Sequence, residues 1–241
     1  MDNSAYIALS RQLTLFRDMD VTANNLANAN TTGYTADHIL FNSLITQDVN
    51  QGDRNPMAFA EDVSTYRNTE NGTLQMTGND LDAAIEGDGY FTVQTPLGTR
   101  YTRNGHFKID GTGRLTTSDN YPVLDSTGQP IVLPEDTLTV QIGAAGNIRV
   151  NGDDFGTFGI AQFANPQLLE RLNGQLFKSD VQPQPATNVQ IAQGMLESSN
   201  VQPVMELTHM LKLSHEVTDT AQFIAIVYDL ERKAASAWTQ Q

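Results

Sequence analysis

The sequence predicts an α+β protein with a helix at each end of the chain and a β-rich region between them. Three observations lead to this prediction. Apolar residues recur at helical spacing in the first 35 residues and again in the last 38. No glycine or proline occurs before Gly33, and none follows Pro203. The middle of the chain instead has short alternating apolar runs separated by turn pairs such as Asn104-Gly105.

The N-terminal helix is predicted over residues 1–36. Leu9, Leu13, Phe16 and Leu26 fall on one helical stripe. Four asparagines stand at the end of this helix: Asn24, Asn25, Asn28 and Asn30. Asparagine is a poor helix former and its amide needs hydrogen-bond partners. We therefore expect these side chains to bond across to neighbouring subunits and to fix their register.

The C-terminal helix is predicted over residues 204–241. A seven-residue pattern connects Leu207, Ser214, Val217, Ala221, Ile224 and Tyr228. Met210, Leu211, Val227 and Leu230 widen this stripe. A stripe of this width indicates more than one packing neighbour, whereas a narrow seam would suggest a two-stranded coil. An ordinary core helix of a globular fold is the alternative.

The middle of the chain divides into three predicted segments. Residues 37–79 have weak periodicity and are predicted to form an extended connector with short strands. Residues 80–185 are predicted to form a compact β-rich domain, and residues 186–203 a return segment. Six strands are expected at 90–93, 100–102, 106–109, 138–142, 147–150 and 158–163. Pro166–Leu172 is expected to form one short helix.

Composition limits the possible functions. The 241 residues include 28 acids against 14 lysines and arginines, so the net charge is −14. Nucleic acids and anionic membranes both need clustered positive charge, and none is present. The chain has no cysteine, which excludes disulfides and thiolate metal sites. We expect no cleavable signal peptide and no membrane span, because no sufficiently long apolar run occurs.

The sequence contains no HExxH, GxSxG or P-loop motif. His209 and His215 are six residues apart, so they cannot chelate one ion as an i, i+4 pair does. The acidic run from Asp80 to Gly89 fails the spacing of a calcium loop, and its glycines are better explained by a tight turn. We therefore expect no enzymatic activity, no metal, no cofactor and no small-molecule substrate.

Four ordered motifs carry a family resemblance over essentially the whole chain. They are residues 23–34 (ANNLANANTTGY), 81–91 (LDAAIEGDGYF), 101–107 (YTRNGHF) and 194–201 (GMLESSNV). Together they resemble the signature blocks of the bacterial flagellar rod and hook proteins. The length and the Met-Asp start are most similar to proximal-rod members of that family, with distal-rod members as the alternative.

This resemblance implies a structural subunit of the flagellar basal-body rod in the periplasm. Its partners would be copies of itself, other rod proteins and the flagellar type III export apparatus. The terminal helices would pair in a coiled-coil-like manner into a helical tube that transmits torque from motor to hook, with the β-domain outside. The expected assembly interface comprises Leu9, Leu13, Phe16, Asn24, Asn25, Leu26, Asn28, Asn30, Leu207, Leu211, Val217, Ala221, Ile224 and Tyr228.

A secreted carbohydrate-binding or adhesin-like β-module with helical tails is the hypothesis from a different class. Such a module needs an exposed aromatic platform. Trp238, the single tryptophan, instead falls in the predicted C-terminal helix. The composition therefore favours the structural subunit.

Overall fold

The computed structural model describes residues 3–46, 57–134, 139–172, 175–186 and 189–238. The chain forms two compact units. Unit 1 comprises Met1–Ala27, Asp37–Arg67 and Gln202–Gln241. Unit 2 comprises Asn28–Ala36 and Asn68–Val201. Each unit is therefore built from segments that are distant in the sequence.

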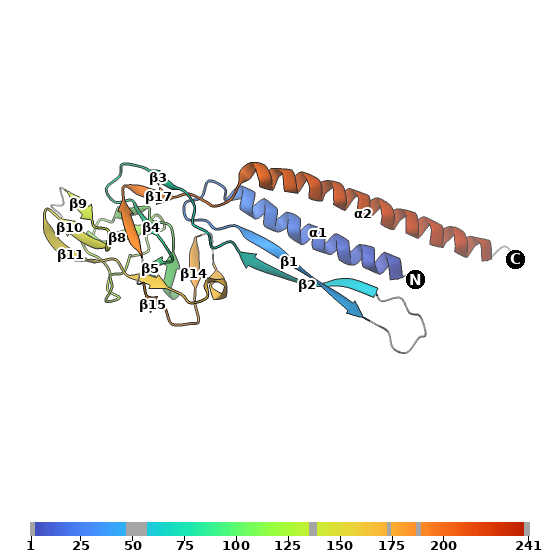
Figure 1. The fold of residues 1–241 in the computed structure, drawn as a ribbon, viewed down its shortest axis with the longest axis horizontal. Helices are drawn as coiled ribbons and strands as arrows, with labels where there is room; N and C mark the ends of the chain where they lie inside the picture. The colour runs from blue at the N-terminus through green and yellow to red at the C-terminus, as the bar shows by residue number, and fades with distance from the viewer. Residues whose placement is uncertain (1–2, 47–56, 135–138, 173–174, 187–188, 239–241) are drawn as a thin grey trace. The chain divides into compact units, whose positions relative to one another are not determined.

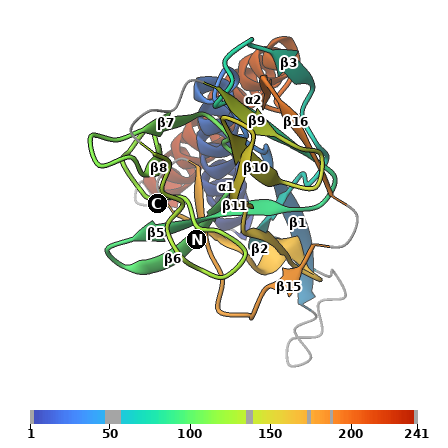
Figure 2. The same ribbon diagram turned by 90° about the vertical axis from the view of Figure 1, so that its left-hand side faces the viewer.

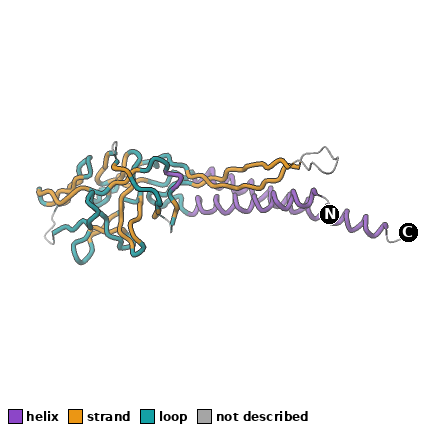
Figure 3. The backbone as a smooth tube through the Cα atoms, turned by 90° about the horizontal axis from the view of Figure 1, so that it is seen from below, coloured by secondary structure: helices purple, strands orange, loops and turns teal. Residues whose placement is uncertain are grey.

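Two helices and one β-hairpin make up the described part of unit 1. Helices α1 (Asn3–Ala27) and α2 (Pro203–Trp238) lie side by side (Figures 1 and 3). Pro203 suits the first turn of α2 because its missing N–H would be unpaired there in any case. The prediction of two terminal helices that pack together, with a β-rich region between them in the sequence, is confirmed.

Helix α1 is shorter than predicted, because it ends at Ala27 and not near residue 36. The backbone N–H of Thr31 donates to Asn28 O at 3.0 Å, and that of Tyr34 donates to Thr31 O at 3.2 Å. These three-residue steps replace the helical ladder. Asparagine and threonine favour such turns over helix, which explains the early end.

The described parts of residues 37–67 form an antiparallel pair of strands that are longer than the short ones we expected. Strand β1 (Asp37–Thr46) pairs antiparallel with β2 (Met57–Arg67), from Asp37 opposite Arg67 to Thr46 opposite Met57. The register shifts once, between Asn42 and Ser43. Both strands pack against α1, so the helix provides the support that a two-stranded ribbon needs.

Unit 2 contains all the other strands that the structure describes, several of which are labelled in Figure 2. A six-stranded sheet has the order β13-β14-β6-β5-β12-β15, with bounds Glu170–Arg171, Leu176–Lys178, Gly98–Thr102, Tyr90–Thr95, Ile160–Gln162 and Gln184–Pro185. A three-stranded sheet has the order β11 (Asp153–Thr157), β10 (Asn147–Val150) and β9 (Val140–Ile142). Three two-stranded ribbons complete the unit: β16 (Gln190–Gln193) with β4 (Ala83–Glu86), β17 (Met195–Glu197) with β3 (Leu74–Met76), and β7 (Phe107–Ile109) with β8 (Leu115–Thr117).

The six predicted strands correspond to β5, β6, β7, β9, β10 and β12, and all are confirmed at the level of their centres. The predicted helix over Pro166–Leu172 is wrong. Only Pro166–Leu168 forms a single 3-10 turn, which Asn165 caps by accepting from Gln167 N. Leu169 is already extended and buried, and the chain then enters β13. Pairing with β14 therefore outweighs the local helical pattern.

Two apolar clusters form the core of unit 2. The larger one is centred on Phe91, Phe107 and Phe158, whose ring centroids lie 5.0–5.7 Å apart. The smaller one contains Tyr90, Tyr101, Ala161, Phe163, Leu169 and Phe177. Its rings meet edge to face, the arrangement that their charge distribution favours.

Two turns of the same design shape this unit. The Oδ1 atom of Asp110 accepts hydrogen bonds from the backbone of Thr112 and Arg114, and that of Asp125 accepts from Thr127 and Gln129 in the same way. The Thr112 hydroxyl also donates to Asp110 at 2.7 Å. That bond and the backbone donors hold the pKa of Asp110 below its usual range. The ionised carboxylate thus stabilises the turn.

Candidate functional site

Each helix of unit 1 has one shielded stripe and leaves other apolar residues exposed, and α1 also buries Thr14 and Asn25 outside its stripe. Every member of the shielded stripes is buried or half-buried: Ala8, Gln12, Leu15, Met19, Thr22 and Leu26 on α1, and Met210, Leu213, Val217, Thr220 and Ile224 on α2. These positions follow one another at alternating steps of three and four residues. That spacing places them along a single face of each helix.

Two polar pairs beside these stripes show how the helices run. Arg11 Nη2 lies 3.5 Å from Glu216 Oε2, and Asp18 Oδ2 lies 3.2 Å from His209 Nε2. The α1 position rises as the α2 position falls, so the helices are antiparallel. Exposed pairs of this kind contribute at most about 1 kcal/mol, and their main effect is on register.

A second face of α1 is apolar and open to solvent. Tyr6, Leu9, Leu13 and Phe16 are all exposed, and Leu13 keeps 58% of its surface accessible whereas Leu15 keeps 7%. Soluble chains rarely expose a contiguous row of large apolar side chains. A separate groove of about 470 Å³ lies between the helices, on the other side of α1, and is lined by Ile7, Ala8, Arg11, Glu216, Asp219, Thr220 and Phe223.

Helix α2 also exposes apolar residues outside its shielded stripe. They are Val204, Met205, Leu207, Leu211, Phe223, Ile226, Tyr228 and Leu230. Helix α2 has 36 residues and α1 has 25. Counted from the two polar pairs at equal rise, α1 begins opposite Ile224, so α2 continues past it (Figure 1). No described residue of α1 lies beside the exposed residues of this extension.

The predicted interface residues fall into three groups. Leu9, Leu13, Phe16, Asn24, Asn30, Leu207, Leu211, Ala221 and Tyr228 are exposed. Leu26, Val217 and Ile224 are half-buried members of the shielded stripes, and Asn28 is half-buried in unit 2. Asn25 differs from all of these because it is 1% exposed.

Asn25 has its hydrogen-bond partners within the chain. Its Nδ2 donates to Asp37 O at 2.8 Å, and its Oδ1 accepts from Asp37 N at 3.0 Å. The amide therefore pairs with the first residue of β1 as a neighbouring strand would. Our expectation of bonds to another subunit does not apply to this asparagine, since it joins α1 to the hairpin. Asn24 Nδ2 bonds to Asp20 O within α1.

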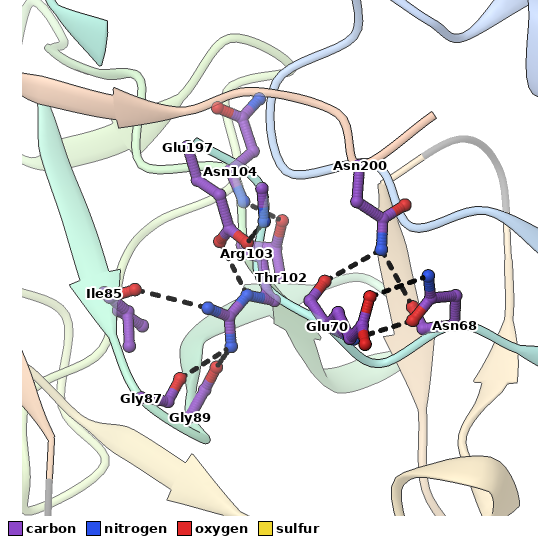
Figure 4. Close-up of polar contacts among 11 residues, drawn as sticks. Asn68, Glu70, Ile85, Gly87, Gly89, Thr102, Arg103, Asn104, Glu197 and Asn200 are labelled. Carbon is purple, nitrogen blue, oxygen red and sulfur yellow. Dashed lines mark hydrogen bonds and ion pairs between the residues drawn. The ribbon is translucent and has the colours of Figure 1, made fainter. Parts of the chain in front are cut away.

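The four motifs quoted above meet in unit 2 at a buried ion pair. Arg103 Nε donates to Glu197 Oε2 at 2.7 Å, with side-chain exposures of 5% and 2% (Figure 4). The Arg103 guanidinium also donates to the carbonyl oxygens of Ile85, Gly87 and Gly89 at 2.9–3.2 Å. A buried charge is tolerated only when it is paired and hydrogen-bonded, and both conditions hold here.

Glu197 extends this network to two further segments. Its Oε1 accepts from Gly72 N at 2.9 Å, and its backbone O accepts from Gly33 N at 2.8 Å. Gly33 has a φ of +68°, and a Cβ there would lie 2.7 Å from the carbonyl carbon of Arg103. Only glycine fits both that conformation and that contact. This explains the glycine in the first motif.

Asn200, close to Glu197 in the sequence, also connects distant segments through hydrogen bonds. Its Oδ1 accepts from Ala36 N at 2.7 Å, and its Nδ2 donates to the carbonyl oxygens of Asn68 and Glu70 at 3.0 and 2.8 Å (Figure 4). One amide thus connects the segment after α1 with the segment after β2. Because Asn200 itself precedes α2, three passages of the chain are fixed together.

Arg171 holds the first of these passages from another side. Its guanidinium lies 4.3 Å from the centre of the Tyr34 ring and donates to Thr35 O at 2.6 Å. No sequence pattern indicated this contact, because Arg171 lies outside the four motifs. Arg103, Glu197 and Asn200 lay inside them, but no role was predicted for their side chains.

Comparison with known proteins agrees with this arrangement. Three family models match: flagella basal body rod protein at residues 6–35, the flagellar hook protein FlgE/F/G D1 domain at 84–150, and the flagellar basal body rod FlgEFG protein C-terminal region at 192–216. The chain is 36% identical over 237 residues to the flagellar basal-body rod protein FlgF of Caulobacter vibrioides, with 97% of each chain covered. The chain belongs to the flagellar basal-body rod protein family.

Other rod proteins support a FlgF-like position within that family. The FlgF of Mesorhizobium japonicum is 36% identical over 224 residues, covering 92% of this chain and 91% of that one. The FlgG of Bacillus subtilis is 32% identical over 236 residues, covering 88% and 89%. The protein is a structural subunit of the flagellar basal-body rod, where it assembles with other rod components. The three matched regions contain residues of all four motifs.

Among the described residues, no group of three or more His, Asp or Glu side chains is placed to hold a metal ion. His106 Nδ1 lies 2.7 Å from Asp82 Oδ1, and Asp82 also accepts from Thr77 and Asn79. This cluster stabilises a turn. Neither described helix combines the length and apolar character needed to cross a bilayer.

Proposed function

We propose that this protein is a proximal-rod subunit of the FlgF type. The support is the 33–36% identity to three FlgF proteins, against 29–32% to the FlgG proteins compared. A distal-rod subunit of the FlgG type is the alternative. A label attached to the chain and located in isolated basal bodies tests the choice, because the two positions differ along the rod axis.

The exposed apolar faces of α1 and α2 form the assembly surface in this proposal. The single observation that carries it is that each helix keeps large apolar residues exposed after its shielded stripe has been covered. The exposed members of the predicted interface on these helices are Leu9, Leu13, Phe16, Asn24, Leu207, Leu211, Ala221 and Tyr228, and Asn30 is exposed in the turn after α1. Covering one exposed leucine contributes about 1.5–3 kcal/mol, so several such contacts hold a subunit firmly.

The shielded stripes support a coiled-coil-like pairing of the two helices. Alternating steps of three and four residues are the spacing of such helix pairs. Leu26, Val217 and Ile224 then act within the subunit, where they hold α1 against α2. Asn28 and Asn25 likewise support the turn and the hairpin that follow α1.

Each segment of the chain has its own role in the proposed rod subunit. Helices α1 and α2 form the helical part of the rod core, and the hairpin of β1 and β2 packs against α1. Residues 68–79 lead to the β-rich outer domain at 80–185, from which residues 186–203 return. Stacked subunits transmit torque from motor to hook through the helical tube. The chain reaches the periplasm through the flagellar type III export apparatus.

Replacing Leu13 with aspartate tests the assembly surface. The substitution places a charge on the exposed face of α1 without touching the shielded stripe. The isolated subunit therefore keeps its helix content, whereas rod assembly and swimming are lost, because burying an unpaired carboxylate costs several kcal/mol. Soft-agar motility and electron microscopy of basal bodies measure the outcome.

The matched control is Leu97→Asp, which makes the same change at a leucine in unit 2 that is 80% exposed. This strain should swim normally, since Leu97 lies outside the proposed surface. Normal swimming of the Leu13→Asp strain would show that this face of α1 stays uncovered in the rod. Equal loss in both strains would show that the effect is not specific to the helices.

A further inference from the structure

The chain contains four Asn-Gly pairs, and the structure distinguishes three of them. They are Asn71-Gly72, Asn104-Gly105 and Asn151-Gly152, whereas Asn173-Gly174 lies outside the described residues. In such a pair the backbone nitrogen of glycine can attack the asparagine side-chain amide, because glycine has no side chain to obstruct the approach. The attack requires the peptide between the two residues to rotate. Local packing therefore decides which pair reacts.

The Asn104-Gly105 pair is held at both ends. The Asn104 side chain donates to Gln175 Oε1 and accepts from His106 N at 3.0 Å. Gly105 is buried, and a Cβ built on it would lie 1.6 Å from Ala83 O. The backbone of β4 therefore lies directly against this glycine. Rotation of the peptide would require local unfolding.

The Asn71-Gly72 pair is fixed through its glycine. Gly72 N donates to the buried carboxylate of Glu197 at 2.9 Å. A Cβ on Gly72 would lie 1.8 Å from Ser198 O, so another backbone segment blocks this side. The nitrogen that would attack is thus engaged in the Arg103–Glu197 network.

The Asn151-Gly152 pair lies in the exposed turn between β10 and β11. Both residues are exposed, and a Cβ on Gly152 would meet no atom within 4 Å. The glycine side of this peptide is therefore sterically open, and Asn151 N, on the other side of Asn151, donates to Thr139 O at 3.1 Å. In addition, Thr139 N donates to Asn151 Oδ1 at 3.2 Å. A donor on this oxygen draws electron density from Cγ and stabilises the negative charge that develops there during attack.

We propose that Asn151 is a site of spontaneous deamidation in the folded protein. Gly152 N loses its proton to water and forms a bond to Asn151 Cγ. The Cγ–Nδ2 bond then breaks, and the amide nitrogen leaves as ammonia, so a succinimide ring remains. One water molecule opens the ring at either carbonyl and yields aspartate or isoaspartate at position 151. No oxidant or reductant takes part.

The fold tolerates one of these products better than the other. Aspartate at position 151 keeps an oxygen that can accept from Thr139 N, and that bond becomes charge-assisted. Isoaspartate adds a methylene group to the main chain within the β10–β11 turn and so alters its path. Either product adds one negative charge to a chain whose net charge is already −14. Subunits that stay in place for a long time would accumulate it on this turn.

Incubating the full chain at mildly alkaline pH tests the proposal. One portion stays folded and the other is held unfolded in guanidinium chloride. Both are sampled over time, digested with pepsin at acid pH to limit further reaction, and mapped by mass spectrometry with separation of isoaspartate. The Asn151→Asp variant supplies the aspartate-containing reference peptide. Asn165, which precedes proline, is the internal control because proline has no N–H to attack with.

The measured quantity is the ratio of the unfolded to the folded reaction rate at each pair. For Asn151 we expect a ratio within about threefold of unity, whereas Asn71 and Asn104 slow by at least about tenfold on folding, because they react only from locally open states. A slowing of Asn151 equal to that of the other two would overturn the proposal. An absence of product at Asn151 in the folded chain would also overturn it. Equal rates at all three pairs in the folded chain would do the same.

Discussion

Replacing Arg103 with methionine should lower the free energy of unfolding of unit 2 by about 3–5 kcal/mol, the usual cost of removing one partner from a buried ion pair. In the wild-type protein the guanidinium donates hydrogen bonds to Glu197 and to the carbonyl oxygens of Ile85, Gly87 and Gly89. Methionine fills similar volume but donates nothing. The Glu197 carboxylate, 2% exposed, would then lack its charged partner.

Hydrogen exchange of the β5 and β6 amides measures this loss, because amides in core strands exchange through global opening and so report the unfolding free energy. The thermal midpoint should also fall by roughly 10 °C, at about 2–4 °C per kcal/mol for a unit of this size. Arg149→Met is the matched control. Its ion pair with Asp154 is exposed, so its effect should stay within about 0.5 kcal/mol.

The double variant Arg103→Met with Glu197→Gln isolates the interaction between the two charges. Glutamine still offers an oxygen to Gly72 N but carries no charge, so the added cost of losing Arg103 should be smaller than in the single variant. Two results would refute the reasoning. One is an Arg103→Met effect no larger than that of Arg149→Met, and the other is strict additivity in the double variant.

Three further predictions concern other parts of the chain. Asn25→Ala should destabilise unit 1 by about 1–3 kcal/mol, because both backbone groups of Asp37 lose their bonds to the amide; faster exchange of β1 amides would show it, and unchanged exchange would contradict it. The pKa of Asp110 is lowered in the folded state, so its contribution to the free energy of unfolding is present above the unfolded pKa of about 4 and is lost as the pH falls below it. The difference in thermal midpoint between wild type and Asp110→Asn should therefore shrink on acidification. A constant difference would argue against it. Finally, limited trypsin digestion of dilute subunit should cut at exposed helix residues such as Arg17 and Lys212 before it cuts at Arg103, because the Arg103 side chain is buried in unit 2. Early cleavage at Arg103 would contradict this.

The prediction of the two helices succeeded because helical periodicity is a local property of the sequence. The end of α1 was harder to place. Asn24, Asn25, Asn28 and Asn30 were recognised as poor helix formers, but local pattern does not say which of them still continues the helix. The structure shows that Asn25 is held within α1 by Asp37, whereas Asn28 begins a turn.

The β-rich region was predicted in character and in six of its strands. Some of the missed strands form short ribbons, such as β3 with β17, whose members lie more than a hundred residues apart in sequence. A three-residue strand has too few alternating positions to give a pattern. Its existence depends on the partner that the fold brings to it, which also explains why Pro166–Leu172 formed a turn and a strand and not a helix.

The sequence by itself determined the family, the presence of a helix near each terminus and the apolar stripes, because motif spacing and periodicity are local properties of the chain. Only the tertiary structure decided which apolar residues of each helix are covered by the fold and which stay exposed. Leu15 and Leu13 both look apolar at helical spacing, yet one is covered by the fold and the other is exposed. Likewise, Arg103 and Glu197 are 94 positions apart, and no local pattern connects them. Burial and pairing depend on which surfaces meet in space, and that is settled only when the whole chain has folded.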